Sequence, residues 1–313
     1  MIRQIIMRRL VQLVAVCWGV GTLTYLLVKA LPGDMAYRIA ASRYGADGVD
    51  ATAAELVRQE LDLDAGGFSA YVDWLLALVK GDFGNSLVSG LPVIDSLASM
   101  LGHSVLLAVV GLVVSAAIAF PVGLMSATRG GLWDKCSLVI STLVRATPIF
   151  VLGVISLIIF ALELPWFPVA GAESAQYLVL PALTLGVSLA AVSNRIVCSS
   201  SRTVFASPYY QFARTKGLSA WRTFFRHGVR NLAVPVVAFM GIQLVTVVEG
   251  MVMIESLFSW PGIGHGLAHA VFARDIPIIQ GAALLMGALF VVLNLVVDVL
   301  CYLLDPRGRW SHD

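Results

Sequence analysis

Long apolar stretches dominate this sequence and restrict the folds that are open to it. Five runs of roughly 20 or more mostly apolar residues occur along the chain, and a sixth is interrupted by polar side chains. Each run is long enough to cross a hydrocarbon core of about 30 Å as a helix. Only 13% of the residues are charged, whereas a typical soluble domain has about a quarter. These features exclude a water-soluble enzyme and predict an all-α polytopic membrane protein with six transmembrane helices.

The expected spans define a division of the chain. The first apolar run is about twice as long as the core of a cleaved signal peptide, so it is expected to remain as an anchor helix. The spans are expected at residues 10–31, 103–127, 137–162, 177–199, 232–254 and 278–304, with Pro121 and Pro148 inside two of them. The predicted division is an anchor at 1–31, an outer segment with short helices at 32–101, a core transmembrane domain at 102–304 with an inner coupling loop at 200–230, and a cytoplasmic tail at 305–313.

The distribution of charge predicts the orientation. With the N-terminus inside, the inner segments hold 14 Lys and Arg residues and three acids, whereas the outer segments hold six Lys and Arg residues and 14 acids. Cytoplasmic loops of membrane proteins carry an excess of Lys and Arg. We therefore expect a multi-pass membrane protein with both termini in the cytoplasm.

The inner connection at residues 195–230 combines basic and aromatic side chains. It has seven Lys and Arg residues and no acid. Such a segment can anchor to anionic lipid headgroups, bind nucleic acid, or insert an apolar face into a groove on a cytoplasmic protein. A six-span protein has little reason to bind nucleic acid, so no nucleic-acid partner is expected. Charge alone does not separate the other two interpretations.

The order of residues in this connection does separate them. The run Tyr210–Leu218, followed by Pro235, resembles the coupling loop of ABC-transporter permeases, and more narrowly that of the dipeptide, oligopeptide and nickel importer family. The family pattern is a Glu-Ala-Ala triplet, a glycine four residues later and a downstream proline. Small Ala213 permits close helix approach, and Gly217 suits a bend between two short helices. At the head of the triplet this chain departs from the pattern, with Gln211 and Phe212 in place of Glu and Ala.

Other segments resemble the same family, in the expected order and on the expected sides. They are Leu31–Asp34, Leu61–Asp64, Gly81–Ser86, Ser89–Val93, Leu180–Leu185, Phe258–Gly264, Arg274–Gly281, Val297–Leu300 and Leu304–Arg307. Together they extend the resemblance over nearly the whole chain, and it implies the transmembrane-domain fold of a type I ABC importer.

The resemblance also implies a location in the bacterial plasma (inner) membrane, a function and a set of partners. It implies a permease subunit of an ATP-driven importer for peptides, nickel or metal-chelating small molecules, which forms half of the translocation pathway. The implied partners are a second homologous permease, two cytoplasmic ATPase subunits, an extracytoplasmic substrate-binding protein and the lipid bilayer. The chain has no GxxxxGK[ST] phosphate loop, so it is expected to be non-catalytic and to hold no cofactor, with ATP and Mg²⁺ bound by the ATPase partners. The resemblance also implies which residues couple the permease to the ATPases: Tyr209, Tyr210, Gln211, Ala213, Arg214, Gly217 and Leu218.

Two residues are candidates for the translocation path. Glu249 lies deep in the fifth span, where an ionisable group is costly unless it faces a partner or a water-filled cavity. It is expected either on the path or in a buried interhelical hydrogen bond. Trp260 begins a Trp-Pro-Gly turn near the expected pore mouth, where it either gates or docks cargo or serves only as a turn.

No functional role is assigned to the remaining polar candidates. His265 and His269 are spaced so that one helix face could hold a metal ion, but two histidines are too few for a tight site, so they are weak candidates and no metal site is expected. Asp298 is expected to make a structural polar contact. Arg145 is expected near the cytoplasmic end of the third span, where its side chain can reach the interface, and no role is assigned to it.

The competing class of protein is a self-sufficient channel or secondary transporter. No inverted repeat and no paired broken helices are evident in the sequence. The basic, aromatic connection would also have no partner to serve. An intramembrane hydrolase has less support, because the chain contains neither a Gly-x-Ser-x-Gly nor an HExxH motif.

Overall fold

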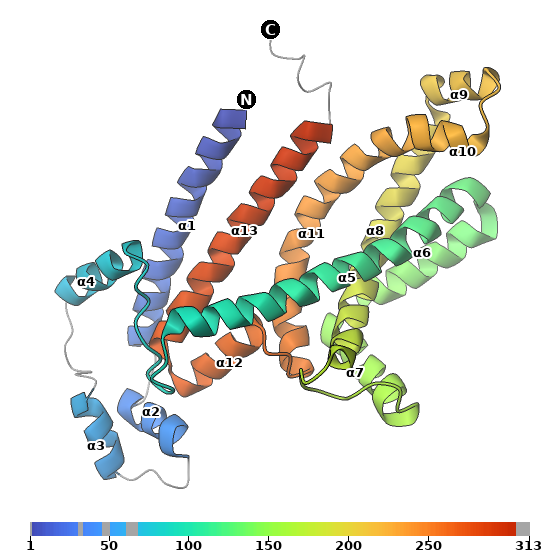
Figure 1. Cartoon of the computed structure of the whole chain (residues 1–313). Helices are drawn as coiled ribbons and strands as arrows, with labels where there is room; N and C mark the ends of the chain where they lie inside the picture. Colours follow the sequence, from blue (N-terminus) through green and yellow to red (C-terminus); the bar gives the residue numbers. More distant parts are fainter. Residues whose placement is uncertain (1, 31–33, 46–50, 61–67, 305–313) are drawn as a thin grey trace. The chain divides into compact units, whose positions relative to one another are not determined.

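The computed structural model describes residues 2–30, 34–45, 51–60 and 68–304 (Figure 1). These residues form helices, with no strand among them beyond one isolated bridge between Asn85 and Pro92. The α-helices are α1 (Ile2–Ala30), α2 (Met35–Tyr44), α3 (Ala51–Glu60), α4 (Phe68–Val79), α5 (Val93–Arg129), α6 (Gly131–Ala146), α7 (Ile149–Leu157), α8 (Val179–Ala206), α9 (Pro208–Thr215), α10 (Ala220–Thr223), α11 (Val229–Leu257), α12 (Ile263–Ala273) and α13 (Ile276–Leu304). Short π-helices occupy Ile158–Glu163 and Phe224–Gly228, and a 3₁₀ turn occupies Ala175–Leu178.

The expectation of an all-helical membrane protein is confirmed. Among the described residues, four helices are long and apolar enough to cross a bilayer, and the number is five if the bent pair α6–α7 counts as one span. The four are Arg3–Leu27, Val93–Arg129, Ala175–Ala206 and Ile276–Leu303. Helix α11 occupies the place of the remaining expected span, although several of its side chains lie outside the described part of the chain.

The third expected span is broken rather than straight. Its two halves, α6 and α7, are bent by 100° at Thr147 and Pro148. The ring of a proline disfavours helical backbone at the residue before it, and Thr147 accordingly has φ −89° and ψ 124°. By contrast, Pro121 stays inside the continuous helix α5.

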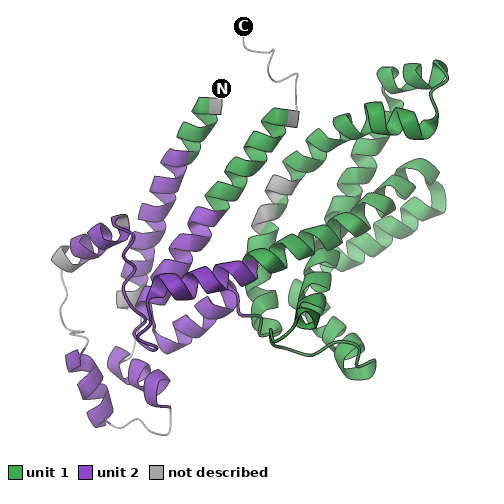
Figure 2. Ribbon diagram, viewed as in Figure 1, with its two compact units in different colours: residues 1–9, 105–260, 290–313 green, residues 10–104, 261–289 purple. Residues whose placement is uncertain are grey.

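The chain divides into two compact units (Figure 2). Unit 1 comprises Met1–Arg9, Val105–Trp260 and Phe290–Asp313, and unit 2 comprises Leu10–Ser104 and Pro261–Leu289. These units are defined by contacts within the chain. The predicted division into anchor, outer segment, core and tail is defined by sides of a membrane, so the units do not test it and it stays a prediction.

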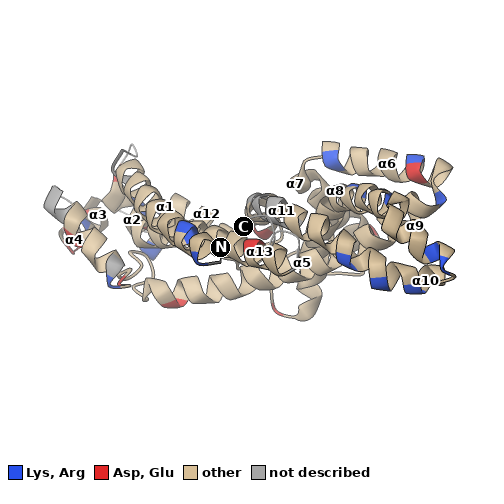
Figure 3. Cartoon of the chain, turned by 90° about the horizontal axis from the view of Figure 1, so that it is seen from above, with Lys and Arg blue, Asp and Glu red and all other residues tan. Residues whose placement is uncertain are grey.

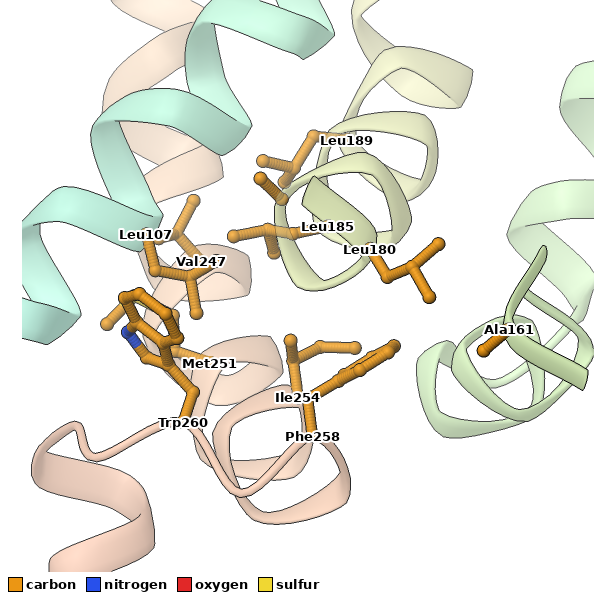
Figure 4. Packing of buried hydrophobic residues seen from close by; sticks show 11 residues of the cluster. Leu107, Ala161, Leu180, Leu185, Leu189, Val247, Met251, Ile254, Phe258 and Trp260 are labelled. Atoms are coloured by element: carbon orange, nitrogen blue, oxygen red, sulfur yellow. The ribbon is translucent and has the colours of Figure 1, made fainter. Parts of the chain in front are cut away.

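The core of unit 1 joins α5, α8 and α11. Figure 4 shows the side chains that meet there, among them Leu107, Leu185 and Val247. Glycines allow the helix backbones to approach: a Cβ added to Gly186 of α8 would lie 2.5 Å from the Cγ1 atom of Val114 in α5. Small residues are the usual means of close helix packing in membranes.

Polar contacts also tie helices of unit 1 together. Between α6 and α8, the Asn194 side-chain amide donates to the Ser141 hydroxyl at 2.8 Å. The Arg9 guanidinium lies 2.7 Å from the Asp298 carboxylate, which confirms the structural polar contact expected for Asp298.

Unit 2 has two apolar clusters of its own. One joins the start of α5 to α12 and α13 through side chains that include Val93, Ile263 and Ala282. The other joins α2 to α3 through Ile39 and Val57. Short helices therefore make up much of the segment between α1 and α5.

Candidate functional site

The basic, aromatic connection folds as two short helices with a glycine turn between them. Helix α9 starts with Pro208, whose fixed φ suits the first position of a helix. Helix α10 is capped by the Ser219 hydroxyl, which accepts a hydrogen bond from the Arg222 backbone N–H at 3.3 Å. Between them Gly217 has φ +83°, a left-handed conformation that side chains with a Cβ rarely adopt. The glycine is therefore required by the backbone turn, since open space surrounds its Cα.

The inner face of α9 packs onto neighbouring elements of unit 1. Tyr210 and Ala213 are buried, and the Tyr210 ring lies 5.2 Å from that of Phe205 near the end of α8. A Cβ added to Gly228, just before α11, would lie 3.5 Å from the Tyr210 ring. Burial raises the pKa of the Tyr210 hydroxyl. Thus Tyr210 lies against α8 and against the π-helix Phe224–Gly228, which leads into α11.

The outer side of the segment exposes aromatic rings. Phe212, Trp221 and Phe225 are 61%, 73% and 53% exposed, and we call these three residues the ring surface. The rings of Trp221 and Phe225 lie 4.4 Å apart. The Lys216 ammonium lies 4.7 Å from the centre of the Phe212 ring. Clustered exposed rings mark surfaces that contact another molecule, and Figure 3 shows basic residues on the same two helices, α9 and α10.

The other residues singled out in this segment support its shape. The Gln211 side-chain amide donates to the Phe205 carbonyl at 2.8 Å, and the Arg214 guanidinium donates to the Leu218 carbonyl at 3.4 Å. Tyr209 is partly exposed, and Leu218 is half-buried. All seven predicted coupling residues therefore lie in this segment, and their role in coupling stays a prediction.

An ion-pair cluster fixes the helix ends beside this segment. The Asp134 carboxylate of α6 accepts from Arg195 and Arg202 of α8, each at 2.8 Å. Arg202 also donates to the Ser126 carbonyl of α5 at 3.1 Å. The ends of three helices are therefore joined where α9 begins. One feature of the sequence pointed to this cluster. Asp134 is the sole acid in the inner connections 128–136 and 195–230, so it is the one carboxylate there with which their basic residues can pair.

A cavity of about 450 Å³ opens beside the break between α6 and α7. Three spans of unit 1 provide its wall, and the polar side chains among the lining residues come from all of them. The lining residues are Arg145, Thr147, Pro148, Ile149, Ser188, Val192, Phe239, Gln243, Thr246 and Gly250. Sequence reasoning missed this group, since its members are scattered and follow no motif.

The two predicted path residues have different positions relative to the cavity. Glu249 belongs to α11 between the lining residues Thr246 and Gly250, but its side chain lies outside the described residues. Trp260 is buried in the apolar core with Val247 and Met251 (Figure 4), so its ring does not line the cavity. A path role for either residue stays a prediction.

The two outer histidines meet on α12 of unit 2. The rings of His265 and His269 have centroids 4.5 Å apart. Burial, with a smaller effect of His269, lowers the pKa of His265. No group of three or more metal-binding side chains was found within the described residues. Metal contact at this pair stays a prediction.

Comparison with known proteins identifies the family. Residues 119–310 match the family described as "Binding-protein-dependent transport system inner membrane component". The chain is 37% identical over 307 residues to the glutathione transport system permease protein GsiC of Escherichia coli strain K12, an alignment that covers 98% of this chain and 99% of the relative. Its identity to GsiC of Shigella dysenteriae serotype 1 is also 37%, with the same coverage. The chain therefore belongs to the binding-protein-dependent transport system inner membrane components, the non-catalytic permease subunits of ABC importers.

Proposed function

We propose that this chain is one of two permease subunits of an importer for peptides or related small molecules, glutathione among them. The cargo class is supported by the 37% identity to glutathione transport permeases over nearly the whole chain. Nickel and metal chelates are further cargoes of the family that the sequence resembles. In this proposal ATP and Mg²⁺ bind to two partner ATPase subunits, and a binding protein delivers the cargo from outside.

The observation that carries the proposal is the two-faced coupling segment. Its ring surface of Phe212, Trp221 and Phe225 is free to enter an apolar groove on an ATPase. Through Tyr210 its inner face contacts α8 and the π-helix that leads into α11. A movement of the ATPase would therefore reach two helices that line the membrane cavity.

This arrangement suits a transport cycle with two discrete states. ATP binding closes the ATPase pair and moves α9 and α10 as a unit. Helices α8 and α11 follow, and the pathway alternates between outward-open and inward-open forms. Every step for this chain is conformational, and the hydrolysis of ATP occurs on the partners.

The proposed topology has six spans, with α11 as the fifth, and both termini in the cytoplasm. It is supported by the excess of Lys and Arg in the inner segments. A cysteine introduced by Glu60→Cys should react with a membrane-impermeant reagent only when the reagent is added outside. A cysteine introduced by Lys216→Cys should react only when the reagent is added inside. The reverse pattern would overturn the orientation.

The experiment for the proposed function is gentle extraction of the tagged chain and identification of the proteins that accompany it. Recovery of nucleotide-binding ATPases and a second permease, with ATP-dependent uptake of labelled glutathione or a dipeptide after reconstitution, would support the proposal. A solitary protein in several detergents would favour a self-sufficient channel or carrier.

A further inference from the structure

We infer that the cavity beside the α6–α7 break binds the carboxylate group of the cargo during passage, with Arg145 as the anion-binding residue. The inference deepens the proposed transport function and rests on it. The cavity volume of about 450 Å³ falls within the range of about 300–1,000 Å³ that is usual for small-molecule sites. A dipeptide or tripeptide is of matching size.

The cavity lies near the middle of the spans that form it. Gln243 is the central residue of α11, equally far from Val229 and Leu257. Arg145 lies about 16 Å along α6 from Asp134, whose carboxylate marks the end beside the coupling segment, at a rise of about 1.5 Å per residue. We therefore infer that Arg145 lies nearer the middle of its span than the expected position near the cytoplasmic end of the third span. The break ends α6 at this depth and places the arginine beside the cavity.

Among the described residues that line the cavity, Arg145 is the ionisable side chain, and it is a cation. Arg145 is exposed, and the structure gives its guanidinium no hydrogen bond or ion pair with any described residue. The described part of the lining contains no carboxylate, and the side chain of Glu249 lies outside it. A cation at membrane depth is costly unless it faces water or an anionic partner. The planar guanidinium pairs with a carboxylate through two parallel hydrogen bonds, which makes that group its best-matched ligand.

Gln243 supplies a second, oriented group. Its side-chain nitrogen donates to the Leu189 carbonyl at 3.2 Å and also to the Ser193 hydroxyl. A carbonyl can only accept, so the amide nitrogen of Gln243 faces α8, which leaves its oxygen as an acceptor. A peptide or ammonium N–H fits this oxygen. The cavity therefore offers a cation for a carboxylate and an acceptor for an N–H donor.

The hydroxyl groups of Ser188 and Thr246 complete the polar lining. Neither makes a hydrogen bond with a described residue. They can replace waters around a carboxylate as it moves along the pathway. Such contacts bind weakly enough for release, which transport requires.

The first test measures the charge of the cavity without any cargo. In the complete reconstituted transporter, Cys17, Cys136, Cys198 and Cys301 are replaced by serine and Thr246→Cys is added as the reporter. The rates of reaction with an anionic and a cationic methanethiosulfonate are then compared with Arg145 present and with Arg145→Gln. The anionic-to-cationic ratio should fall about tenfold on loss of the guanidinium. Arg129→Gln is the matched control, because Arg129 lies at the end of α5 beside Trp133 and not in the cavity.

Two results of this test would overturn the inference. One is a ratio that is equal in the two backgrounds. The other is a reporter at position 246 that reacts with neither reagent, because the site would then be closed to solutes. Neither result depends on the identity of the cargo.

The second test asks whether the site recognises a carboxylate. Uptake of a dipeptide with neutral side chains, which has a single carboxylate, is compared with uptake of its C-terminal amide in Arg145→Gln and Arg145→Lys transporters. Because the same binding protein serves all variants, its own preference cancels from the comparison. Arg145→Gln should lower uptake of the acid about tenfold more than uptake of the amide, and Arg145→Lys should recover part of the difference.

Equal losses for the acid and the amide would show that Arg145 has a structural role and would contradict the inference. If the unmodified transporter moves neither probe, the cargo assignment in the proposed function fails. The labelling ratio still decides the charge of the cavity in that case.

Discussion

The coupling segment and the membrane cavity belong to the same compact unit, but the sequence encodes them in opposite ways. The coupling segment is one continuous stretch, Pro208–Gly228, whose glycine, small residue and rings stand at recognisable spacings. The described residues of the cavity wall lie between positions 145 and 250, on three spans that meet only after folding. A contiguous surface can be recognised as a motif, whereas a cavity depends on where helices bend and pack.

The two regions also differ in what they leave unsatisfied. The coupling segment exposes apolar rings, and the cavity holds polar groups among largely apolar helices. Each arrangement is unfavourable for the isolated chain and becomes favourable with a bound partner or solute. In the proposed function the coupling segment meets a protein, and the cavity meets a polar solute.

The largest expected effect comes from the turn in the coupling segment. Gly217→Val forces a β-branched side chain into the left-handed conformation at φ +83°. We expect uptake to fall at least about tenfold while membrane insertion stays normal, because the strain of about 1–3 kcal/mol distorts only α9 and α10. Uptake and surface biotinylation measure the two quantities.

The matched control for this turn is Gly217→Asn. Asparagine tolerates left-handed backbone better than other residues with a Cβ, so this variant should keep most of its uptake. Equal activity of the Val and Asn variants would show that the turn is not needed for coupling.

A smaller effect is expected from the helix packing that carries the cavity. Gly186→Ala places a Cβ 2.5 Å from the Cγ1 atom of Val114 and 3.0 Å from the Gly111 carbonyl oxygen. Such overpacking costs about 1–3 kcal/mol, so the purified protein should melt several degrees lower. Gly102→Ala serves as the control, because its Cβ would meet nothing within 4 Å. An unchanged melting temperature for Gly186→Ala would contradict the close approach of α5 and α8.

The smallest effect is expected at the ion-pair cluster between the two regions. Asp134→Asn removes the negative charge shared by Arg195 and Arg202 and should destabilise the fold by no more than about 1 kcal/mol, because all three side chains are partly exposed. We expect uptake to fall about twofold as the ends of α6 and α8 loosen. Lys135→Gln, a change at the neighbouring exposed residue, should leave uptake unaltered. A loss as large as that of Gly217→Val would make the cluster part of the coupling path itself.

Much of the fold could be predicted from the sequence because membranes impose simple length rules. The apolar runs place the helices, and the residues around Gly217 identify the coupling segment. The break at Pro148 could not be predicted, since Pro121 lies in an equally apolar run and leaves α5 continuous. Whether a proline breaks a membrane helix depends on how neighbouring groups satisfy the freed backbone, which is a property of the packed structure.

Long-range contacts were likewise outside the reach of sequence reasoning. The bond between Arg195 and Asp134 spans 61 positions, and that between Gln243 and Ser193 spans 50. No local pattern specifies such pairs. Arg145 illustrates the consequence, because the break at Thr147 changes its surroundings from a span end to a cavity wall.

The central claim is that the ring surface of the coupling segment holds the partner ATPase. The direct measurement is the amount of ATPase subunit that remains bound per copy of the tagged chain after extraction, for the unmodified chain, for Trp221→Ser and for Trp133→Ser. Trp133 is also exposed but lies on α6, so it is the matched control. We expect Trp221→Ser to lose about nine-tenths of the ATPase and Trp133→Ser to keep it, as is usual for a buried aromatic anchor in an interface. Equal retention by all three chains would contradict it.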